Sequence, residues 1–353
     1  MTHRRVALPT ATGIALTGLI LSGCATDASS PAEGGGDETL IVYSNSVSDG
    51  RGEWLVAQAA EAGFDVEYVD AGGGEIAQRV IAEATNPIAD VVFGPNNVHF
   101  EYMKAADALE AYEPAWADKV EPIDPSGVYH AIVQEPIMIV YNTEAFANPG
   151  DAPQDWTDLF EDESFHGRYE TATTLTGGTT QLVVTSLLSR YREDDGYLGI
   201  SEDGWAAIDS FFEHGSPVVE GTDLYARMSS GEVDMGQMWL AGKASREQEY
   251  GVQSEAIRPS VGVPLVNQGI GVVKGSDNAE LAQEFVDWFG SAEIQAAWSQ
   301  EFFTAPTNAD AIADANPDAV EMTASFTAQD IDWAFVAENL SSWVEEIELN
   351  HLG

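Results

Sequence analysis

Basic side chains are scarce in this 353-residue chain, which holds 14 lysine and arginine residues against 59 aspartate and glutamate residues. The formal net charge at pH 7 is −45. Because binding to nucleic acid requires clusters of basic side chains that neutralise phosphates, we expect no nucleic-acid partner. Two explanations of the acidity stay open, namely attraction of cationic ligands and solubility in a salty exterior. The spread of acidic residues along the whole chain favours solubility.

Cysteine is almost absent, since Cys24 is the only one in the chain. A single thiol excludes a disulfide within one molecule and a cysteine-based metal cluster. The six histidines have no paired spacing, and the HExxH, GxSxG and P-loop patterns are also missing. We therefore predict a protein that is not an enzyme, that binds no cofactor and that has no resident metal site.

The N-terminus has the pattern of an export signal. A basic start that includes Arg4 and Arg5 precedes an apolar run over 12–21, and small residues then lead to Cys24. The run is too short for a transmembrane helix, so it indicates a secretory signal. This start resembles the lipobox of bacterial lipoproteins. The resemblance implies that residues 1–23 are removed and that Cys24 receives a diacylglyceryl group, which anchors the protein to the cell membrane outside the cytoplasm.

Two alternatives to this interpretation stay open. The signal could be an ordinary secretory one with an incidental cysteine, and Arg4 with Arg5 leaves both Sec and twin-arginine export open. Residues 24–38 contain too little apolar surface to fold, so we predict a flexible tether there. The rest of the chain is long enough for two domains of about 150 residues each.

From residue 39 onward, short apolar runs alternate with segments whose apolar residues have the spacing of one helix face. Strands are expected at 39–43, 64–69 and 90–93, with helices at about 49–62 and 75–84 between them. This alternation is typical of an α/β fold with a mostly parallel sheet.

The apolar run over 131–141 is interrupted by Pro136, which argues against one continuous central strand and predicts a bend or a change of lobe. Beyond it we expect helices near 179–191, 204–214, 279–289 and 293–300 and strands at 233–238, 260–264 and 269–273.

The order of several short passages resembles the solute-binding proteins of ABC importers, in the two-lobed group that includes ferric-iron, thiamine, polyamine and phosphonate binders. The matching passages lie at 41–44, 73–80, 86–94, 139–143, 228–234 and 269–275. The resemblance implies a type 2 periplasmic-binding-protein fold, in which each lobe is a mostly parallel sheet flanked by helices and the ligand cleft lies between the lobes. It also implies a monomer that binds a small solute and delivers it to the permease subunits of an importer.

The same resemblance divides the chain into lobes. Residues 39–134 with 260–308 would form lobe 1, and residues 135–259 would form lobe 2. The C-terminal helical segment, 309–353, stays unassigned.

Ligands of open α/β sheets bind beyond the carboxyl ends of the strands. That rule selects small and amide-bearing residues in lobe 1: Ser44, Asn45, Ser46, Gly73, Gly74, Asn96 and Asn97. The glycines could instead form a plain strand-to-helix turn. In lobe 2, Gly178, Thr179 and Thr180 begin a helix whose N–H groups could hold an anion, although a simple threonine cap explains them equally well.

Glu135, Trp239 and Tyr225 complete the list of candidates. Glu135 interrupts an apolar run at the expected crossing between lobes, where it could meet a ligand ammonium or pair with an arginine. Trp239 follows a strand at the point where ferric-iron binders of the family place paired tyrosines, and no two tyrosines are adjacent in this chain. An indole there suits stacking on a cation, or it could belong to the core, and Tyr225 is a further aromatic candidate.

We therefore expect an amine-bearing or zwitterionic organic solute such as a polyamine, thiamine or an aminophosphonate. Ferric iron is the alternative ligand. A signalling or scaffolding lipoprotein without transport is the alternative function.

Overall fold

The computed structural model of the protein describes residues 39–121 and 123–352. The predicted signal, Cys24 and the tether therefore lie outside the described residues. Within the described part, none of the helices combines the length and the apolar character needed to cross a bilayer.

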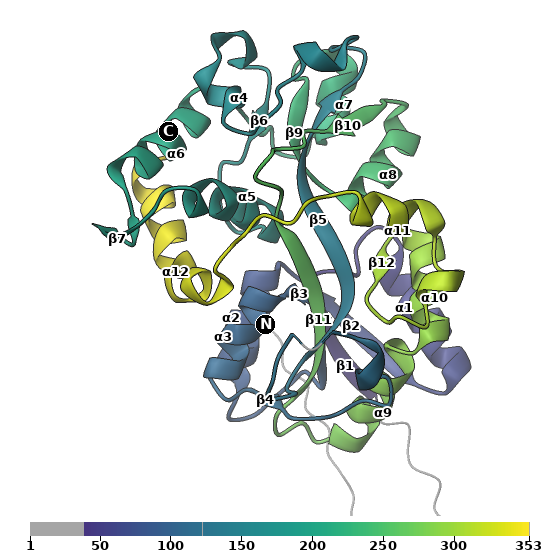
Figure 1. The fold of residues 1–353 in the computed structure, drawn as a ribbon. Coiled ribbons are helices and arrows are strands. Elements are labelled where there is room, and N and C mark those ends of the chain that lie inside the picture. The colour runs from purple at the N-terminus through teal and green to yellow at the C-terminus, as the bar shows by residue number, and fades with distance from the viewer. Residues whose placement is uncertain (1–38, 122, 353) are drawn as a thin grey trace, which may run out of the picture. The chain divides into compact units, whose positions relative to one another are not determined.

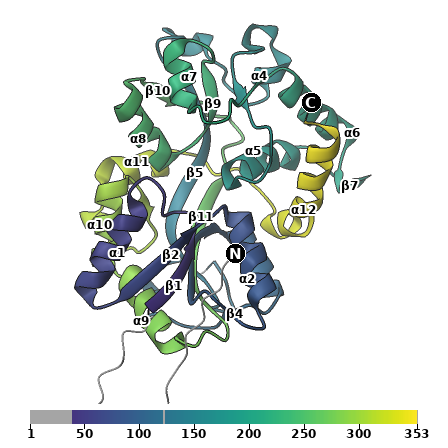
Figure 2. The ribbon, with the colours of Figure 1, turned by 180° about the vertical axis from the view of Figure 1, so that it is seen from behind.

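Lobe 1 is built on three parallel strands, β1 (Thr39–Ser44), β2 (Asp65–Asp70) and β3 (Val91–Asn96), in the order β2-β1-β3. Helices α1 (Arg51–Ala62) and α2 (Gly73–Glu83) connect them and lie on opposite faces of the sheet (Figure 2). Connections between parallel strands are right-handed, and here β1 lies between β2 and β3. The helix that leads from β1 to β2 and the helix that leads from β2 to β3 therefore lie on opposite faces of the sheet.

Each face of the lobe 1 sheet has its own apolar core. One core packs α1 with α9 (Ala279–Phe289) and α10 (Ala292–Phe302), and the other packs α2 with α3 (Asn97–Ala105). The short strand β4 (Leu109–Glu110) and the 3-10 turn η1 (Ala117–Lys119) complete this lobe.

Two long strands, β5 (His130–Asn142) and β11 (Leu265–Val273), pair antiparallel, and β5 continues from lobe 1 into lobe 2 (Figure 1). The expected interruption of the first strand is wrong, because β5 continues through Pro136. Pro136 is paired in the register with Leu265 of β11. The next residue of β5, Ile137, is paired with Trp239 of strand β9. The missing N–H of Pro136 thus falls where β5 changes partners, and it breaks no continuous ladder.

Lobe 2 departs from the expected parallel pairing. Strand β5 enters it from lobe 1 and pairs antiparallel with both β9 (Met235–Trp239) and β10 (Ser254–Ala256), because β9 leads back toward lobe 1. In the part of this lobe that the structure describes, parallel pairing is limited to the short strands β6 (Glu170–Thr171) and β8 (Ser216–Pro217) and a bridge from Tyr169 to Met235. The other lobe 2 elements are η2 (Pro149–Asp151), α4 (Asp158–Glu161), η3 (Glu163–Phe165), α5 (Gly178–Ser189), β7 (Arg192–Tyr197), α6 (Glu202–Glu213), α7 (Leu224–Ser230) and α8 (Leu240–Tyr250).

A strand expected at 260–264 is also absent from the structure, which has a turn there. Gly262 adopts a left-handed φ of 89°, and Pro264 has no N–H to donate. Only Val263 forms a β-bridge, with Ala328. The strand β11 therefore begins one residue after the proline.

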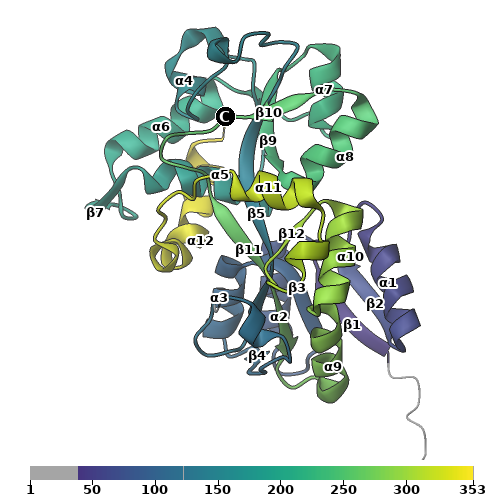
Figure 3. The ribbon, with the colours of Figure 1, turned by 45° about the vertical axis from the view of Figure 1, so that its right-hand side comes forward.

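The C-terminal segment contacts both lobes. Strand β12 (Ala305–Pro306) pairs with β5, then η4 (Ile312–Asp314) leads to α11 (Pro317–Ala324), which lies across the region where the lobes meet (Figure 3). The last helix, α12 (Trp333–Asn350), contacts α3 of lobe 1 and α5 of lobe 2. Its buried residues, including Leu340 and Trp343, belong to the lobe 2 core.

Candidate functional site

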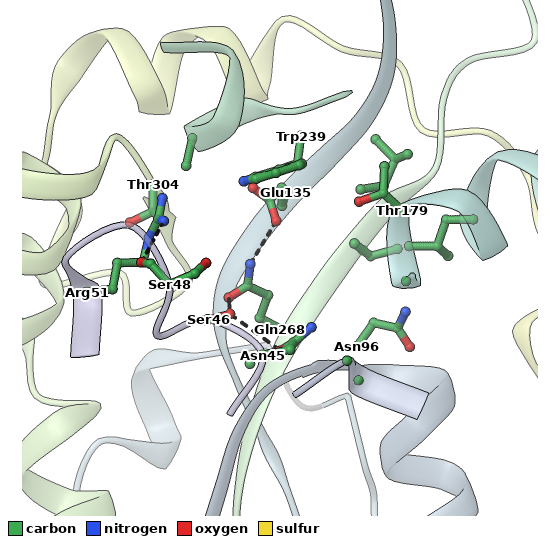
Figure 4. Close-up of a pocket in the computed structure, with 18 of the residues that line it drawn as sticks. Asn45, Ser46, Ser48, Arg51, Asn96, Glu135, Thr179, Trp239, Gln268 and Thr304 are labelled. Carbon is green, nitrogen blue, oxygen red and sulfur yellow. Dashed lines mark hydrogen bonds between the residues drawn. The ribbon is translucent and has the colours of Figure 1, made fainter. Parts of the chain in front are cut away.

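A cavity of about 500 Å³ lies between the lobes and receives side chains from both. Its floor is the crossing pair β5 and β11, which supplies Glu135 and Gln268 (Figure 4). Arg51, Ser48 and Thr304 lie on one side of this pair, and Asn96 and Thr179 lie on the other. Polar groups therefore converge on the cavity from opposite ends.

The loop after β1 is held against the floor of the cleft by a short chain of hydrogen bonds. Ser46 Oγ donates to Gln268 Oε1 over 3.1 Å, and Gln268 Nε2 donates to Glu135 Oε2 over 2.7 Å. Gly94, with φ 96°, permits this approach, since a Cβ there would stand 2.6 Å from both Asn45 Oδ1 and Ser46 Oγ. The orientation of the Gln268 amide is fixed by its two partners.

Glu135 is a buried carboxylate, with 7% of its surface exposed. Burial raises its pKa, while the hydrogen bond from Gln268, the charge of Arg51 and the backbone N–H of Ala241 act in the opposite direction. The carboxylate thus already has protein partners, and the nearby positive charge of Arg51 partly balances it.

Arg51 is the cationic side chain of the cavity lining, and only 7% of the residue is exposed. Its Nη1 donates to Ser48 O at 3.3 Å and lies 3.6 Å from Asp49 Oδ2. Both contacts use Nη1, so Nε and Nη2 have no protein partner within residues 39–121 and 123–352. Burial lowers the pKa of the guanidinium, and the charges of Glu135 and Asp49 oppose that shift. Such a group favours an anionic partner that can reach its remaining donors.

Two helices begin at the cleft without a side-chain cap. Gly72 precedes α2 and Gly177 precedes α5, and neither position provides a side-chain acceptor. By contrast, Asn96 Oδ1 accepts from the backbone N–H groups of Val98 and His99 at the start of α3. The first N–H groups of α2 and α5 therefore retain their attraction for negative charge.

Trp239 ends β9 and is half-buried in the cleft wall. Its indole packs on α8, where a Cβ added to Gly242 would stand 2.6 Å from Cε2 of the ring. The guanidinium carbon of Arg246 lies 5.0 Å from the ring centroid. The indole is thus held between helix α8 and the solute space.

The structure brings eight of the thirteen predicted ligand-binding residues to this cavity: Asn45, Ser46, Gly73, Asn96, Glu135, Gly178, Thr179 and Trp239. The other five lie elsewhere. Ser44 is fully buried and its Oγ accepts from Ser46 N, whereas Gly74 faces His99 and Gln181. Asn97 lines a different cavity.

The two remaining candidates are engaged inside lobe 2. Thr180 is buried and accepts a hydrogen bond from Gln237 Nε2 at 2.6 Å. Tyr225 is fully buried in the lobe 2 core, with its hydroxyl 2.7 Å from Ser254 Oγ. Neither side chain lines the cavity between the lobes.

Six polar or aromatic lining residues were not predicted: Ser48, Arg51, Asp70, Gln268, Trp298 and Thr304. Arg51 had a usable signal, since it directly follows the loop after β1 in a chain with few arginines. Trp298 and Thr304 reach the cleft only through the packing of α10 on lobe 1, which local sequence does not reveal.

Side chains of the crossing strands alternate between two faces, as the strand geometry requires. Glu135, Val266 and Gln268 face the cleft, whereas Gln134 and Asn267 line the rear. Two cavities of about 360 and 640 Å³ lie on that rear face and share Asn267. No group of three or more acidic, histidine or cysteine side chains placed to hold a metal ion occurs in the described part of the chain.

Two α/β lobes joined by crossing strands, with polar groups converging on the cleft between them, define a solute-binding protein. The chain belongs to the bacterial extracellular solute-binding protein family, whose model matches residues 45–296. It is 33% identical over 315 residues to a probable ABC transporter periplasmic-binding protein of Sinorhizobium fredii, a match that covers 88% of this chain and 86% of that protein.

Two further comparisons differ in the ligand that they name. A Salmonella paratyphi A protein named for 2-aminoethylphosphonate binding is 25% identical over 284 residues, covering 78% of this chain and 80% of that protein. The structure of iron-bound HitA from Pseudomonas aeruginosa has a TM-score of 0.72 and 20% identity, covering 88% of this chain and 99% of that one. The expected family and fold are thus confirmed: the protein is the extracytoplasmic, non-enzymatic solute-binding component of an ABC importer.

Proposed function

We propose that the transported solute is a small organic zwitterion, with an anionic group held by Arg51 and an amine facing the carboxylates of Glu135 and Asp70. The observation that carries the proposal is the buried guanidinium of Arg51, which lines the cleft and, within residues 39–121 and 123–352, uses only Nη1 for hydrogen bonds and ion pairs. Its guanidinium carbon also lies 5.2 Å from the ring centroid of Phe302. Its remaining donors suit a carboxylate, phosphate or phosphonate oxygen. The uncapped starts of α2 and α5 favour the same sign of charge.

The charges of the cleft decide between solute classes. Arg51 contributes one positive charge, and Glu135 and Asp70 are the two carboxyl groups of the lining. Burial raises the pKa of both carboxyls, and the charge of Asp49 raises that of Asp70 further. A dianion without an amine would therefore bring negative charge into a cleft whose described lining holds one cation, Arg51. A zwitterion supplies its own balancing charge and is favoured.

Trp239 supports the amine half of the solute. An indole face attracts an organic cation, and the effect grows when water is excluded from the site. The Salmonella relative named for 2-aminoethylphosphonate binding is consistent with this class, since that compound has both an amine and a phosphonate.

Ferric iron stays the alternative ligand, because a solved neighbour of the same fold is iron-bound HitA. Among residues 39–121 and 123–352, however, the cavity lining includes no tyrosine, and Glu135 and Asp70 are its only carboxylates. Transport is favoured over a scaffolding role, since an interlobe cavity of about 500 Å³ suits a small solute.

Anchoring at the membrane is the second half of the proposal. Cys24 follows the export signal, so the mature protein begins with a thiol that accepts a diacylglyceryl group. Residues 24–38 then tether a monomeric body close to the permease subunits of the importer.

A thermal-unfolding screen with 2-aminoethylphosphonate, thiamine, spermidine, fructose 6-phosphate and ferric citrate tests the solute class. A zwitterion at 100 times its dissociation constant should stabilise the protein by about 2.7 kcal/mol. In calorimetric titrations, Arg51→Gln should weaken its binding roughly 10- to 100-fold, because hydrogen bonds to a charged group are lost. The control is Arg258→Gln, which alters an exposed arginine away from the cavity lining and should leave binding unchanged. Tighter binding of fructose 6-phosphate or ferric ion than of any amine would refute the proposal.

A further inference from the structure

Asp49 of lobe 1 lies between two arginines that belong to different lobes. Its Oδ2 is 3.6 Å from Nη1 of Arg51 in lobe 1 and 3.2 Å from Nη1 of Arg246 in helix α8 of lobe 2. The Asp49–Arg246 contact is therefore an ion pair between the lobes. It lies beside the cleft, because Arg51 lines the cavity and Arg246 lies over Trp239, which also lines it.

Arg246 contacts four groups at once, one of which is Ser245 Oγ, which accepts from Nη1 at 3.1 Å. Besides Asp49, its Nε lies 3.2 Å from Asp223 Oδ2, and its guanidinium carbon is 5.0 Å from the centroid of Trp239. The side chain of Arg246 is only 18% exposed. Loss of the Asp49 carboxylate would therefore leave the partly buried Arg246 with one acidic partner, Asp223. The position of Arg246 over the indole would then be fixed from lobe 2 alone.

The backbone at Asp49 has an uncommon conformation. Asp49 has a left-handed φ of 55°, and Gly50 follows it with φ 83°. A left-handed conformation is unfavourable for most residues, although aspartate and asparagine tolerate it best. Two such residues in a row turn the chain sharply before α1. Asparagine is thus a replacement at position 49 that removes the charge and keeps the turn.

We propose that Asp49 and Arg246 form an ionic latch that holds the lobes together over the solute, and that Arg246 is the positioning residue that fixes the indole of Trp239. Closure brings the carboxylate of lobe 1 onto Arg246, and Arg246 then holds Trp239 against α8 in the cleft wall. The latch rests on the proposed function only in its effect on the solute, since the contacts from Asp49 through Arg246 to Trp239 are made by protein side chains alone.

The effect of the latch on release of the solute can be measured by stopped flow, with 2-aminoethylphosphonate as the probe and the full-length chain in detergent. Asp49→Asn and Arg246→Gln should each raise the dissociation rate about three- to fivefold, as expected of a partly exposed ion pair, and leave the association rate nearly unchanged. The double variant should be no faster than either single one. At 1 M salt the wild type should approach the variants, because the pair is screened.

The matched control is Asp332→Asn. Asp332 pairs with Arg192 at 2.6 Å, away from the cleft, and its Oδ1 accepts from Phe335 N, a role that asparagine keeps. This variant should release the probe at the wild-type rate. A wild-type dissociation rate in both Asp49→Asn and Arg246→Gln, or additive effects in the double variant, would overturn the latch while leaving the proposed solute class intact.

A second measurement needs no solute. In 19F NMR of the chain labelled with 5-fluorotryptophan, the resonance missing from Trp239→Phe identifies Trp239. Asp49→Asn should shift that resonance although Asp49 does not touch the indole, and Asp332→Asn should not. An unmoved resonance would overturn the positioning role of Arg246. If no solute binds but the resonance shifts, the proposed solute class fails and the latch stands.

Discussion

The imidazole of His99 in α3 and the side-chain amide of Gln181 in α5 meet between the two lobes, with 3.3 Å between Nε2 and Oε1. Gln181 Nε2 donates to Leu175 O, so its oxygen faces the imidazole and the imidazole proton is assigned to Nε2. His99 Nδ1 has no protein partner among residues 39–121 and 123–352, and it faces Gly73. Burial lowers the pKa of His99 to about 4.

Acid should weaken the fold through His99. The unfolded chain binds a proton at the ordinary histidine pKa of about 6.5, whereas folded His99 stays neutral down to about 4. Stability from this residue is therefore complete above pH 6.5 and is lost as the pH falls toward 4. The loss should reach about 3 kcal/mol. Urea unfolding at several pH values should show a shallower pH dependence in His99→Asn than in wild type. Identical slopes would contradict the prediction.

Gly73 should resist substitution more than Gly178, although both line the cleft. A Cβ at Gly73 would stand 2.9 Å from His99 Nδ1, whereas one at Gly178 would meet nothing within 4 Å. We expect Gly73→Ala to lower the free energy of unfolding by about 1–3 kcal/mol, as overpacking does. Gly178→Ala should raise it by about 0.4–1 kcal/mol, because alanine restricts the unfolded chain. Urea denaturation of both variants decides this, and equal midpoints would count against it.

Binding of an amine should depend on pH through Glu135. Burial raises the pKa of this carboxyl above its ordinary value, so protonation begins at a higher pH than for an exposed glutamate. Affinity for the amine should fall as the pH drops through that region, since the protonated acid no longer attracts an ammonium. In Glu135→Gln the affinity should be lower at neutral pH and should fall less over the same region, because only Asp70, whose pKa is also raised by burial, still loses its charge near the amine. Calorimetric titration between pH 4 and 8 would measure both, and a wild-type profile in the variant would exclude this role.

Cys24 should determine membrane attachment. Mass spectrometry of membrane-extracted protein should show an N-terminus at Cys24 with a diacylglyceryl group, because two acyl chains give stable anchoring. Cys24→Ala should appear in the soluble fraction. A variant that stays in the membrane to the wild-type extent would rule out the lipid anchor.

Local signals in the sequence were sufficient for most of lobe 1. Gly63 ends α1 in the left-handed conformation that only glycine adopts easily, and the apolar spacing of Ile76 and Val80 places one face of α2 in the core. The errors came from prolines whose context is tertiary. Pro136 lies where β5 changes partners, and Pro264 directly precedes β11, with its carbonyl accepting from Ile137 N. Sequence alone does not show which strands pair with the residues before and after a proline.

The candidate site was predictable only where chain order determines position. Asn45, Ser46 and Asn96 follow strands of a parallel sheet, and those ends must lie at one edge. Arg51 was missed because it belongs to a helix rather than to the loop before it. Tyr225 was selected for its aromatic ring, yet it shares a helix face with Met228 at a spacing of three, which is the pattern of a core position.

The alternation along β11 determines how solute preference can change in evolution. Val266 and Gln268 line the cleft, while Leu265 and Asn267 line the rear cavities. A point substitution at 266 or 268 can therefore alter the chemistry of the cleft and leave the rear surface intact. A one-residue insertion or deletion upstream in this strand would exchange the two sets of side chains. Solute preference among related transporters should therefore change through substitutions at positions 266 and 268. Insertions and deletions in β11 should be selected against, because they would exchange the side chains of the cleft with those of the rear cavities.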